Sequence, residues 1–418
     1  MKKFNILAGL LLLFYVQAGA QKKAVSPAFL FLSDVHLNTF SDTTFYGVDT
    51  GLELWKAFIN KIDALLAGSN APKFIVYTGD LPAHYQCGET CVLPPDQRQD
   101  HNQNLAAILK GLRDVATKHK KPLFYLPGNN DGIAGDYTSF ADEQQKTPFS
   151  LIPETKNPYP APNSKPGGMV PPCIVSNPHP TMGYYSAKPV AGLRLIALNT
   201  VIYSKSFIPV DGSQQISDGN TQLKWLAAQL SDAARKGEKA YIAMHIPPGT
   251  DAYKYDKDPV GATMWAPLPD TVNTWLRQFL GIVAAHKKTI AGILYGHTHM
   301  DELRRLYDPS GSTITEVAIS CPGVTPQHYN NPGFKIVQYD AASKELLNFN
   351  TYYTVPAAKK WGNNTYNFNT VFGFPSNKTL YSNLSSATLS SINTSLNKIF
   401  TVMNGPAGYN IQPGIEVK

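Results

Sequence analysis

The feature that most constrains the fold is an alternation of short apolar runs with amphipathic segments. Six runs rich in β-branched and aromatic residues predict strands, at residues 28–33, 73–78, 122–127, 193–199, 239–244 and 291–296. Four segments between them have apolar residues at helical spacing, at about residues 51–67, 103–119, 219–236 and 269–287. Strands that alternate with helices in this way predict an α/β fold, an open sheet with helices on its faces.

Two regions depart from this alternation. Residues 143–182 are rich in proline and have little periodicity, so we expect a long excursion over the surface, which could form a wall of a substrate cleft. From about residue 346 the composition shifts to Asn, Ser, Thr and Tyr. We therefore expect a main domain over residues 27–345 and a C-terminal subdomain over residues 346–418, and 43% hydrophobic residues suffice for a large core.

The N-terminus has the pattern of a secretory signal peptide. Lys2 and Lys3 precede an apolar run from Ile6 to Val16, and a small-residue "AGA" ends at Ala20. These 11 apolar residues are too few to span a bilayer, which takes roughly 20. We interpret residues 1–20 as a signal peptide and expect a secreted or periplasmic protein. An N-terminal anchor helix is the alternative.

Charge excludes one class of partner. Removal of residues 1–20 takes away two lysines and lowers the formal charge from +7 to +5, spread over 398 residues (418 minus 20). The chain has no run of Lys and Arg with interleaved aromatic residues, so nucleic acid is not expected as a partner. The composition does not specify an oligomeric state.

Four cysteines in an exported chain favour disulfides over free thiols. Cys87 and Cys91, in "QCGETC", could close a small loop and leave Cys173 and Cys321 to pair. Four cysteines allow three connectivities, and the sequence does not choose among them.

Polar residues gather where the predicted strands end. The sequences that follow are "SDVH" after the first strand, "GDLPAH" after the second, "GNND" after the third, "MHIPPG" after the fifth and "GHTH" after the sixth. Ligands of open α/β sheets bind beyond the carboxyl ends of the strands, so these five groups are expected to converge.

The converging residues have the chemistry of metal ligands. They are Asp34, His36, Asp80, Asn129, His245, His297 and His299. In the two pairs with i, i+2 spacing, extended backbone would point both side chains to one side. Seven oxygen and imidazole donors are too many for one tetrahedral ion and suit two divalent cations that share a carboxylate.

At these residues the chain resembles the calcineurin-like metallophosphoesterases, whose pattern is D-x-H, G-D, G-N-H-[DE], a lone H and G-H-x-H. More narrowly, "TGDLPAH", "HIPPG", "YGHTHMDE" and "NPGF", in that order, resemble the acid sphingomyelinase-like phosphodiesterases. The resemblance covers roughly residues 27 to 355. It implies a β-sandwich core flanked by helices, with a small C-terminal appendage.

The resemblance also implies a division of the ligands. One cation would be held by Asp34, His36, Asp80 and His299, and a second by Asp80, Asn129, His245 and His297. Two cations (+4), two aspartates (−2) and a bridging hydroxide (−1) leave the site near +1, which suits an anionic phosphoryl group. Paired cations can activate water for in-line displacement, so we expect hydrolysis without a covalent enzyme intermediate.

Position 130 departs from the family pattern. Asn130 stands where the pattern has a histidine that assists the leaving group, and an amide cannot supply a proton. The resemblance offers His84 as a replacement, because the sphingomyelinase-like branch has a second active-site histidine in "GD-x-P-A-H". A structural histidine that caps a loop is the alternative interpretation of His84.

Two features that the chain lacks indicate which metal and which substrates to expect. Purple acid phosphatases have a metal-binding tyrosine three residues after the Asp of G-D, but this chain has Ala83, so zinc is expected rather than redox iron. No cysteine-rich helical module precedes the first predicted strand, which favours soluble phosphodiesters, nucleotides or CDP-alcohols over sphingomyelin, although a membrane lipid stays an open alternative. The candidate substrate contacts, which could equally be packing residues, are Tyr184, Tyr185, His328 and Tyr329.

We therefore expect a secreted two-metal phosphodiesterase that hydrolyses phosphodiester or pyrophosphate bonds. Two other functions stay open. One is a phosphomonoesterase of the same superfamily. The other is a metal-bound binding protein that has little or no turnover because Asn130 replaces the family histidine.

Overall fold

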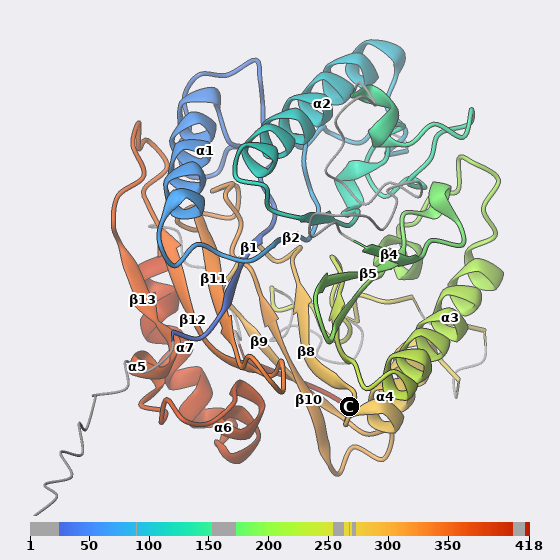
Figure 1. Ribbon diagram of the computed structural model, residues 1–418. Helices are drawn as coiled ribbons and strands as arrows, with labels where there is room; N and C mark the ends of the chain where they lie inside the picture. The colour runs from blue at the N-terminus through green and yellow to red at the C-terminus, as the bar shows by residue number, and fades with distance from the viewer. Residues whose placement is uncertain are drawn as a thin grey trace, which may run out of the picture.

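The computed structural model describes residues 25–88, 90–152, 173–253, 263–266, 268–269, 273–403 and 414–418 (Figure 1). The expected signal peptide lies outside the described residues, and so do residues 153–172 of the proline-rich excursion.

The strands form two sheets. The six-stranded sheet has the order β13-β12-β11-β1-β2-β3. Its strands are β1 (Ala28–Leu32), β2 (Ile75–Tyr77), β3 (Leu123–Tyr125), β11 (Gly333–Tyr339), β12 (Leu346–Tyr353) and β13 (Thr365–Asn367). The eight-stranded sheet has the order β14-β9-β10-β8-β7-β6-β5-β4. Its strands are β4 (Cys173–Ser176), β5 (Tyr185–Val190), β6 (Leu193–Ala197), β7 (Lys239–Ala243), β8 (Ile290–Tyr295), β9 (Leu303–Tyr307), β10 (Ile314–Ser320) and β14 (Gly414–Val417).

All six predicted strands are present, but they do not share one open sheet. β1, β2 and β3 are parallel neighbours in the first sheet, whereas β6, β7 and β8 are parallel neighbours in the second. The β-sandwich core that the resemblance implied is therefore confirmed, and the single sheet inferred from periodicity is wrong. Periodicity reports which segments are strands and does not report which strands pair.

The two sheets pack face to face, as the alternation within single strands shows. In β7, Tyr241 and Ala243 belong to the core between the sheets, while Ala240 and Ile242 belong to a second core on the outer face. Successive side chains of a strand point to opposite faces, so β7 contributes to both cores. The ring centroids of Phe29 in β1 and Tyr241 lie 5.7 Å apart across the sandwich.

Helices cover both outer faces (Figure 1). Helices α1 (Leu52–Ala67) and α2 (Pro95–Lys118) pack with the first sheet, and α3 (Gln215–Arg235) and α4 (Trp275–His286) with the second. The four predicted helices are present. Helix α2 begins eight residues earlier than expected, because Pro95 starts it and its first turns are polar. No helix in the described ranges is both long and apolar enough to cross a bilayer.

The boundary expected at residue 346 is not a boundary between sheets. β12 pairs antiparallel with β11, and β14 pairs parallel with β9, so residues beyond 346 complete both sheets. Three C-terminal helices, α5 (Phe368–Phe372), α6 (Leu380–Ser386) and α7 (Leu389–Met403), lie together beside them (Figure 1).

One of the two expected disulfides is present. Cys87 and Cys91 are bonded, but Cys321 is a buried free thiol that donates to the Phe31 carbonyl at 3.1 Å. The suggested pair of Cys173 and Cys321 is wrong. Cys173 lies in edge strand β4, and Cys321 follows β10, five strand positions away. Neighbouring strands are about 4.8 Å apart, so the two cysteines lie beyond disulfide reach.

Candidate metal centre

The structure brings all seven predicted donors to one end of the sandwich. Asp34 and His36 follow β1, Asp80 follows β2, and Asn129 follows β3 in the first sheet. From the second sheet, His245 follows β7, and His297 and His299 follow β8. The donor atoms fall into two groups, and within each group all atoms lie within 4.8 Å of one another. The first group is Asp34, His36, Asp80 and His299, and the second is Asp80, His245 and His297.

The backbone at these strand ends is not extended. Asp34, His36, Asp80, His297 and His299 have φ between 44° and 76°, in the left-handed region that non-glycine residues seldom occupy. The expectation that extended backbone aligns the i, i+2 pairs is therefore wrong, although the side chains do converge. Strained backbone of this kind is concentrated at functional sites.

Two glycines allow the strand ends to approach each other. Gly79 has φ of 91°, and a Cβ on it would lie 2.2 Å from the Gly128 nitrogen. A Cβ on Gly128 would lie 2.2 Å from Asp80 Oδ1. The glycines of "TGDLPAH" and "GNND" thus let the segment with Asn129 pack directly on the Asp80 carboxylate.

The first donor set is buried and oriented. His36 Nδ1 donates to the Pro82 carbonyl at 3.0 Å, which leaves Nε2 without a proton and directed at the other donors. That Nε2 lies 3.2 Å from His299 Nε2 and 3.3 Å from Asp80 Oδ2. Asp34 Oδ1 lies 3.5 Å from His299 Nε2. Two imidazole nitrogens that face each other this closely, between two carboxylates, fit a cation between them.

The second donor set shares Asp80. His245 Nδ1 donates to the Thr78 carbonyl at 2.6 Å, and its Nε2 lies 3.2 Å from Asp80 Oδ2 and 3.0 Å from Asn129 Oδ1. His297 Nδ1 lies 2.9 Å from the same amide oxygen and 3.2 Å from His245 Nε2. Four donor atoms, two nitrogens and two oxygens, therefore surround one point, and the residues present fit a second cation.

Burial and neighbouring charges raise the pKa of some of these groups and lower the pKa of others. Burial raises the pKa of Asp34 to about 7, and the charge of Asp80 adds to that effect while His245 opposes it. Burial lowers the pKa of His297 to about 3. Burial would also lower the pKa of His245, but the charge and hydrogen bond of Asp80 outweigh it and raise the pKa to about 9.

Two residues of "GNND" hold the Asp80 loop. Asn130 donates to Asp80 from its backbone nitrogen at 2.8 Å and from its side-chain nitrogen at 3.1 Å. The Asp131 carboxylate accepts from the backbone nitrogens of Asp80, Leu81 and Gly128. Asp131 therefore holds three backbone nitrogens of this loop together. The family pattern includes an acidic residue at this position, but the sequence did not predict its role, because an Asp after two asparagines is equally typical of a turn.

His84 lies at the mouth of the centre. Its ring stacks on His36 with centroids 3.9 Å apart, and its side chain is 33% exposed, whereas that of His36 is fully buried. His84 Nδ1 donates to Asp49 Oδ1 at 2.8 Å, and this bond directs Nε2 away from Asp49. Burial opposes protonation, but the hydrogen bond and charge of Asp49 outweigh it and raise the pKa of His84. Sequence analysis missed Asp49, which lies just before α1 and has no motif around it.

The four aromatic candidates occupy different places. His328 lies beside the centre, with ring centroids 4.6 Å from His299 and 4.9 Å from Tyr253, a residue that sequence analysis missed. Tyr329 packs against Gly47. Tyr184 and Tyr185 are buried, and the Tyr185 hydroxyl donates to the Tyr125 carbonyl at 2.9 Å. Tyr185 is therefore placed as a core residue and not as a substrate contact.

Comparison with known proteins gives a family match over most of the chain. The family model described as calcineurin-like phosphoesterase matches residues 27–301. Sphingomyelinase phosphodiesterase D of Dictyostelium discoideum is 29% identical over 318 residues, 74% of this chain and 61% of that protein.

Two mouse proteins match a shorter part of the chain. Acid sphingomyelinase-like phosphodiesterase 3b of Mus musculus is 31% identical over 187 residues, 41% of this chain and 37% of that protein. Cyclic GMP-AMP phosphodiesterase SMPDL3A of Mus musculus is 32% identical over 179 residues, again 41% of this chain and 37% of that protein. The chain thus spans less than two thirds of the length of each of these relatives.

Among solved structures, a dimetal phosphatase from Danio rerio aligns with 82% of this chain and 98% of its own. The TM-score is 0.49 and the sequence identity is 13%.

Proposed function

The chain belongs to the calcineurin-like phosphoesterase family, and from that premise we propose that this metal-dependent phosphoesterase is a secreted two-metal phosphodiesterase. Its substrates would be soluble phosphodiesters or pyrophosphates, such as nucleotides or CDP-alcohols, with sphingomyelin-like lipids as the alternative. We assign the first cation to Asp34, His36, Asp80 and His299, and the second to Asp80, Asn129, His245 and His297.

The observation that carries this proposal is the shared carboxylate. Asp80 Oδ2 lies 3.3 Å from His36 Nε2 and 3.2 Å from His245 Nε2, and each of these histidines belongs to a different donor set. Both imidazoles have Nδ1 committed to a backbone carbonyl. A carboxylate between two oriented imidazoles is the arrangement that holds a pair of cations.

Two divalent cations held there would lower the pKa of water and stabilise charge on the attacking and leaving oxygens of a phosphoryl group. The protein itself would supply orientation and a proton. Asn130 fixes the Asp80 carboxylate through two hydrogen bonds. His84 is the partly exposed histidine at the mouth of the centre, held by Asp49, and we assign it to deliver a proton to the leaving oxygen.

Zinc and export are also part of the proposal. Imidazole and carboxylate donors suit zinc, and the N-terminal pattern of residues 1–20 supports export. The relatives are named sphingomyelinase phosphodiesterase D and cyclic GMP-AMP phosphodiesterase SMPDL3A, which supports a diester rather than a monoester as substrate.

A comparison of two chromogenic substrates tests the reaction class. We expect zinc-loaded protein to hydrolyse bis-p-nitrophenyl phosphate with a higher kcat/KM than p-nitrophenyl phosphate. The reverse preference would make the chain a phosphomonoesterase, and no turnover of either in protein with two bound zinc ions would make it a binding protein. A screen of nucleotides, CDP-choline and sphingomyelin would then identify the substrate class.

A further inference from the structure

We propose that Asp136 is a positioning residue for the second cation and that the Cys87–Cys91 disulfide holds Asp136 in place. The inference rests on the proposed function, since it assigns a role in the second donor set. Asp136 lies in a loop beyond the strand ends, and the sequence has no motif around it.

The amide of Asn129 can bind a cation in only one of its two orientations. An asparagine side chain has an oxygen at one end that can bind a cation and a nitrogen at the other that cannot. Asn129 Nδ2 donates to Asp136 Oδ1 at 2.8 Å. That bond directs Oδ1 toward His245 Nε2 and His297 Nδ1, at 3.0 and 2.9 Å. Without an acceptor at Asp136, the amide could rotate and present its NH₂ group to the cation.

Backbone hydrogen bonds on two sides hold the loop that contains Asp136. The Tyr137 nitrogen donates to the Asn129 carbonyl at 2.7 Å, so the loop that contains Asp136 closes on the residue it orients. On its other side the loop pairs with the chain that follows the disulfide. The Leu93 nitrogen donates to the Ala134 carbonyl at 2.8 Å, and Val92 and Gly135 form an antiparallel bridge.

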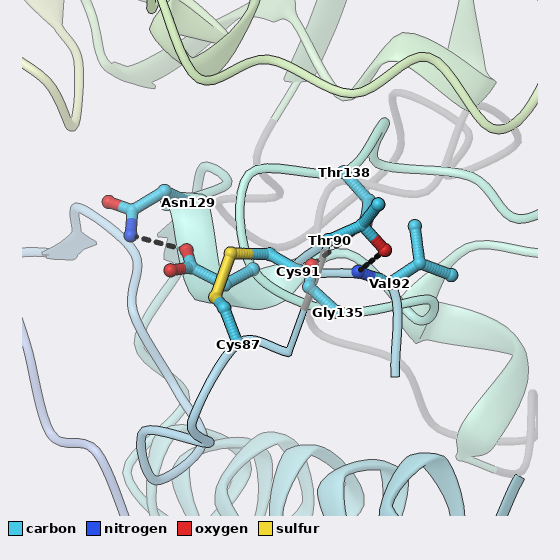
Figure 2. Close-up of a disulfide and its surroundings, with 8 residues drawn as sticks. Cys87, Thr90, Cys91, Val92, Asn129, Gly135 and Thr138 are labelled. Carbon is cyan, nitrogen blue, oxygen red and sulfur yellow. Dashed lines mark hydrogen bonds between the residues drawn. A yellow bond between two sulfur atoms is a disulfide. The ribbon is translucent and has the colours of Figure 1, made fainter. Parts of the chain in front are cut away.

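The Cys87–Cys91 disulfide lies next to this loop. Figure 2 shows the Cys87–Cys91 bond beside Gly135, with Asn129 close by. The two sulfur atoms and a carboxylate oxygen of Asp136 lie within 4.8 Å of one another. Gly135 has φ of 135°, and a Cβ there would lie 2.2 Å from the Cys91 carbonyl oxygen, so the two backbones are in direct contact. The disulfide joins two residues with a sequence separation of four, so it ties Cys91, where the segment that pairs with the Asp136 loop begins, to Cys87.

These contacts form one chain from the disulfide to the second cation. The disulfide fixes residues 91–93, these pair with residues 134–135, and Asp136 then sets the amide of Asn129. The first donor set has no member in this chain of contacts. The inference therefore predicts a loss that is specific to the second cation.

Zinc titration of the full chain tests this, with calorimetry and bound zinc measured by mass spectrometry. We expect wild type to bind two zinc ions, and Asp136→Ala to weaken the second by about 10–100-fold, the usual effect of losing an outer-shell partner. Asp136→Asn keeps an acceptor oxygen and should lie between the two. The double variant Cys87→Ser/Cys91→Ser should weaken the same ion by a smaller factor. We choose substitutions over reducing agents because thiol reagents bind zinc.

Asp142→Ala is the matched control. Asp142 is also a buried aspartate in the segment after β3, but its carboxylate accepts from the backbone of Gln144 and Lys146. The Asp142→Ala variant should have lower thermal stability and unchanged affinity for both zinc ions. Equal weakening of both ions by Asp136→Ala, or no weakening, would overturn the role of Asp136. An unchanged second affinity in the double cysteine variant would overturn the role of the disulfide.

The same titration separates this inference from the proposed function. Wild type that binds fewer than two zinc ions, or His245→Ala that still binds two, would overturn the two-metal assignment and the inference with it. The inference alone would be overturned if wild type binds two ions, His245→Ala binds one, and Asp136→Ala binds two with undiminished affinity.

Discussion

The two donor sets of the centre share a carboxylate but are oriented in different ways. In the first set, Asp34, His36, Asp80 and His299 all have a left-handed backbone. In the second set only Asp80 and His297 do, while His245 is fixed by its bond to the Thr78 carbonyl and Asn129 by its bond to Asp136. His36 in the first set is fixed in the same way by its bond to the Pro82 carbonyl. The two sets therefore differ mainly in the backbone conformation and in Asn129, whose amide is oriented by a side chain outside both sets. Substitutions outside the donors should therefore affect the second cation more.

The largest effect is expected from Asp80→Ala, which removes the residue that the two sets share. Both cations should be lost and hydrolysis of bis-p-nitrophenyl phosphate should fall to background, because each set loses its link to the other. Bound zinc and kcat/KM measure this. Asp114→Ala, an exposed change on α2, is the control. Two bound ions with normal turnover in Asp80→Ala would contradict the sharing.

The next effect separates the two sets. His36→Ala should lose the first cation and His245→Ala the second, each with an affinity loss greater than the about 10–100-fold typical of outer-shell changes. One bound zinc ion per chain is expected in each variant, and the double variant should bind none. If either single variant loses both ions, the sets are not separable as described.

A smaller effect is expected at His84 and Asn130, which we propose to lie where the leaving group departs. An alkoxide leaving group needs a proton and p-nitrophenolate does not, and general acid catalysis is typically worth roughly 10²–10⁴-fold. His84→Ala should slow alkyl phosphodiesters most and spare nitrophenyl ones. Asn130→His should accelerate alkyl substrates more than nitrophenyl ones.

The measurement is kcat/KM for both substrate types in the parent and the two variants. Unchanged ratios in Asn130→His at intact zinc content would mean that position 130 does not affect proton delivery. In that case the two bonds from Asn130 to Asp80 describe its whole role.

The smallest effect is a difference in pH dependence. A cation binds neutral His245, with a pKa of about 9, and ionised Asp34, with a pKa of about 7. Both groups must lose a proton to bind, so affinity falls as the pH is lowered through each value. Between pH 9 and 7 the second affinity should fall by about tenfold per pH unit, and the first should change little. Calorimetry in buffers of different ionisation heats would detect the released proton, and parallel pH profiles would contradict the difference.

Much of this centre could be predicted from the sequence, because its donors end strands that are themselves distinct. A run such as residues 239–244 is apolar enough to indicate a buried strand, and the histidine that follows stands out. The pairing of strands into two sheets could not be predicted, because partners such as β1 and β11 are about 300 residues apart in the chain.

The supporting carboxylates were missed for a different reason. Asp49, Asp131 and Asp136 lie in loops, where aspartate is common as a turn residue whatever its partners are. Their roles depend on contacts with residues as far away as His84 and Asp80. The left-handed backbone was missed as well, since residue types such as Asp and His do not reveal the sign of φ.

The most direct test of the central claim is anomalous diffraction at the zinc edge from crystals grown with zinc. We expect two peaks, roughly 3.5–4 Å apart as in other two-metal sites. One peak should lie among Asp34, His36 and His299, the other among Asn129, His245 and His297, and Asp80 should lie next to both. A single peak, or peaks away from Asp80, would contradict it.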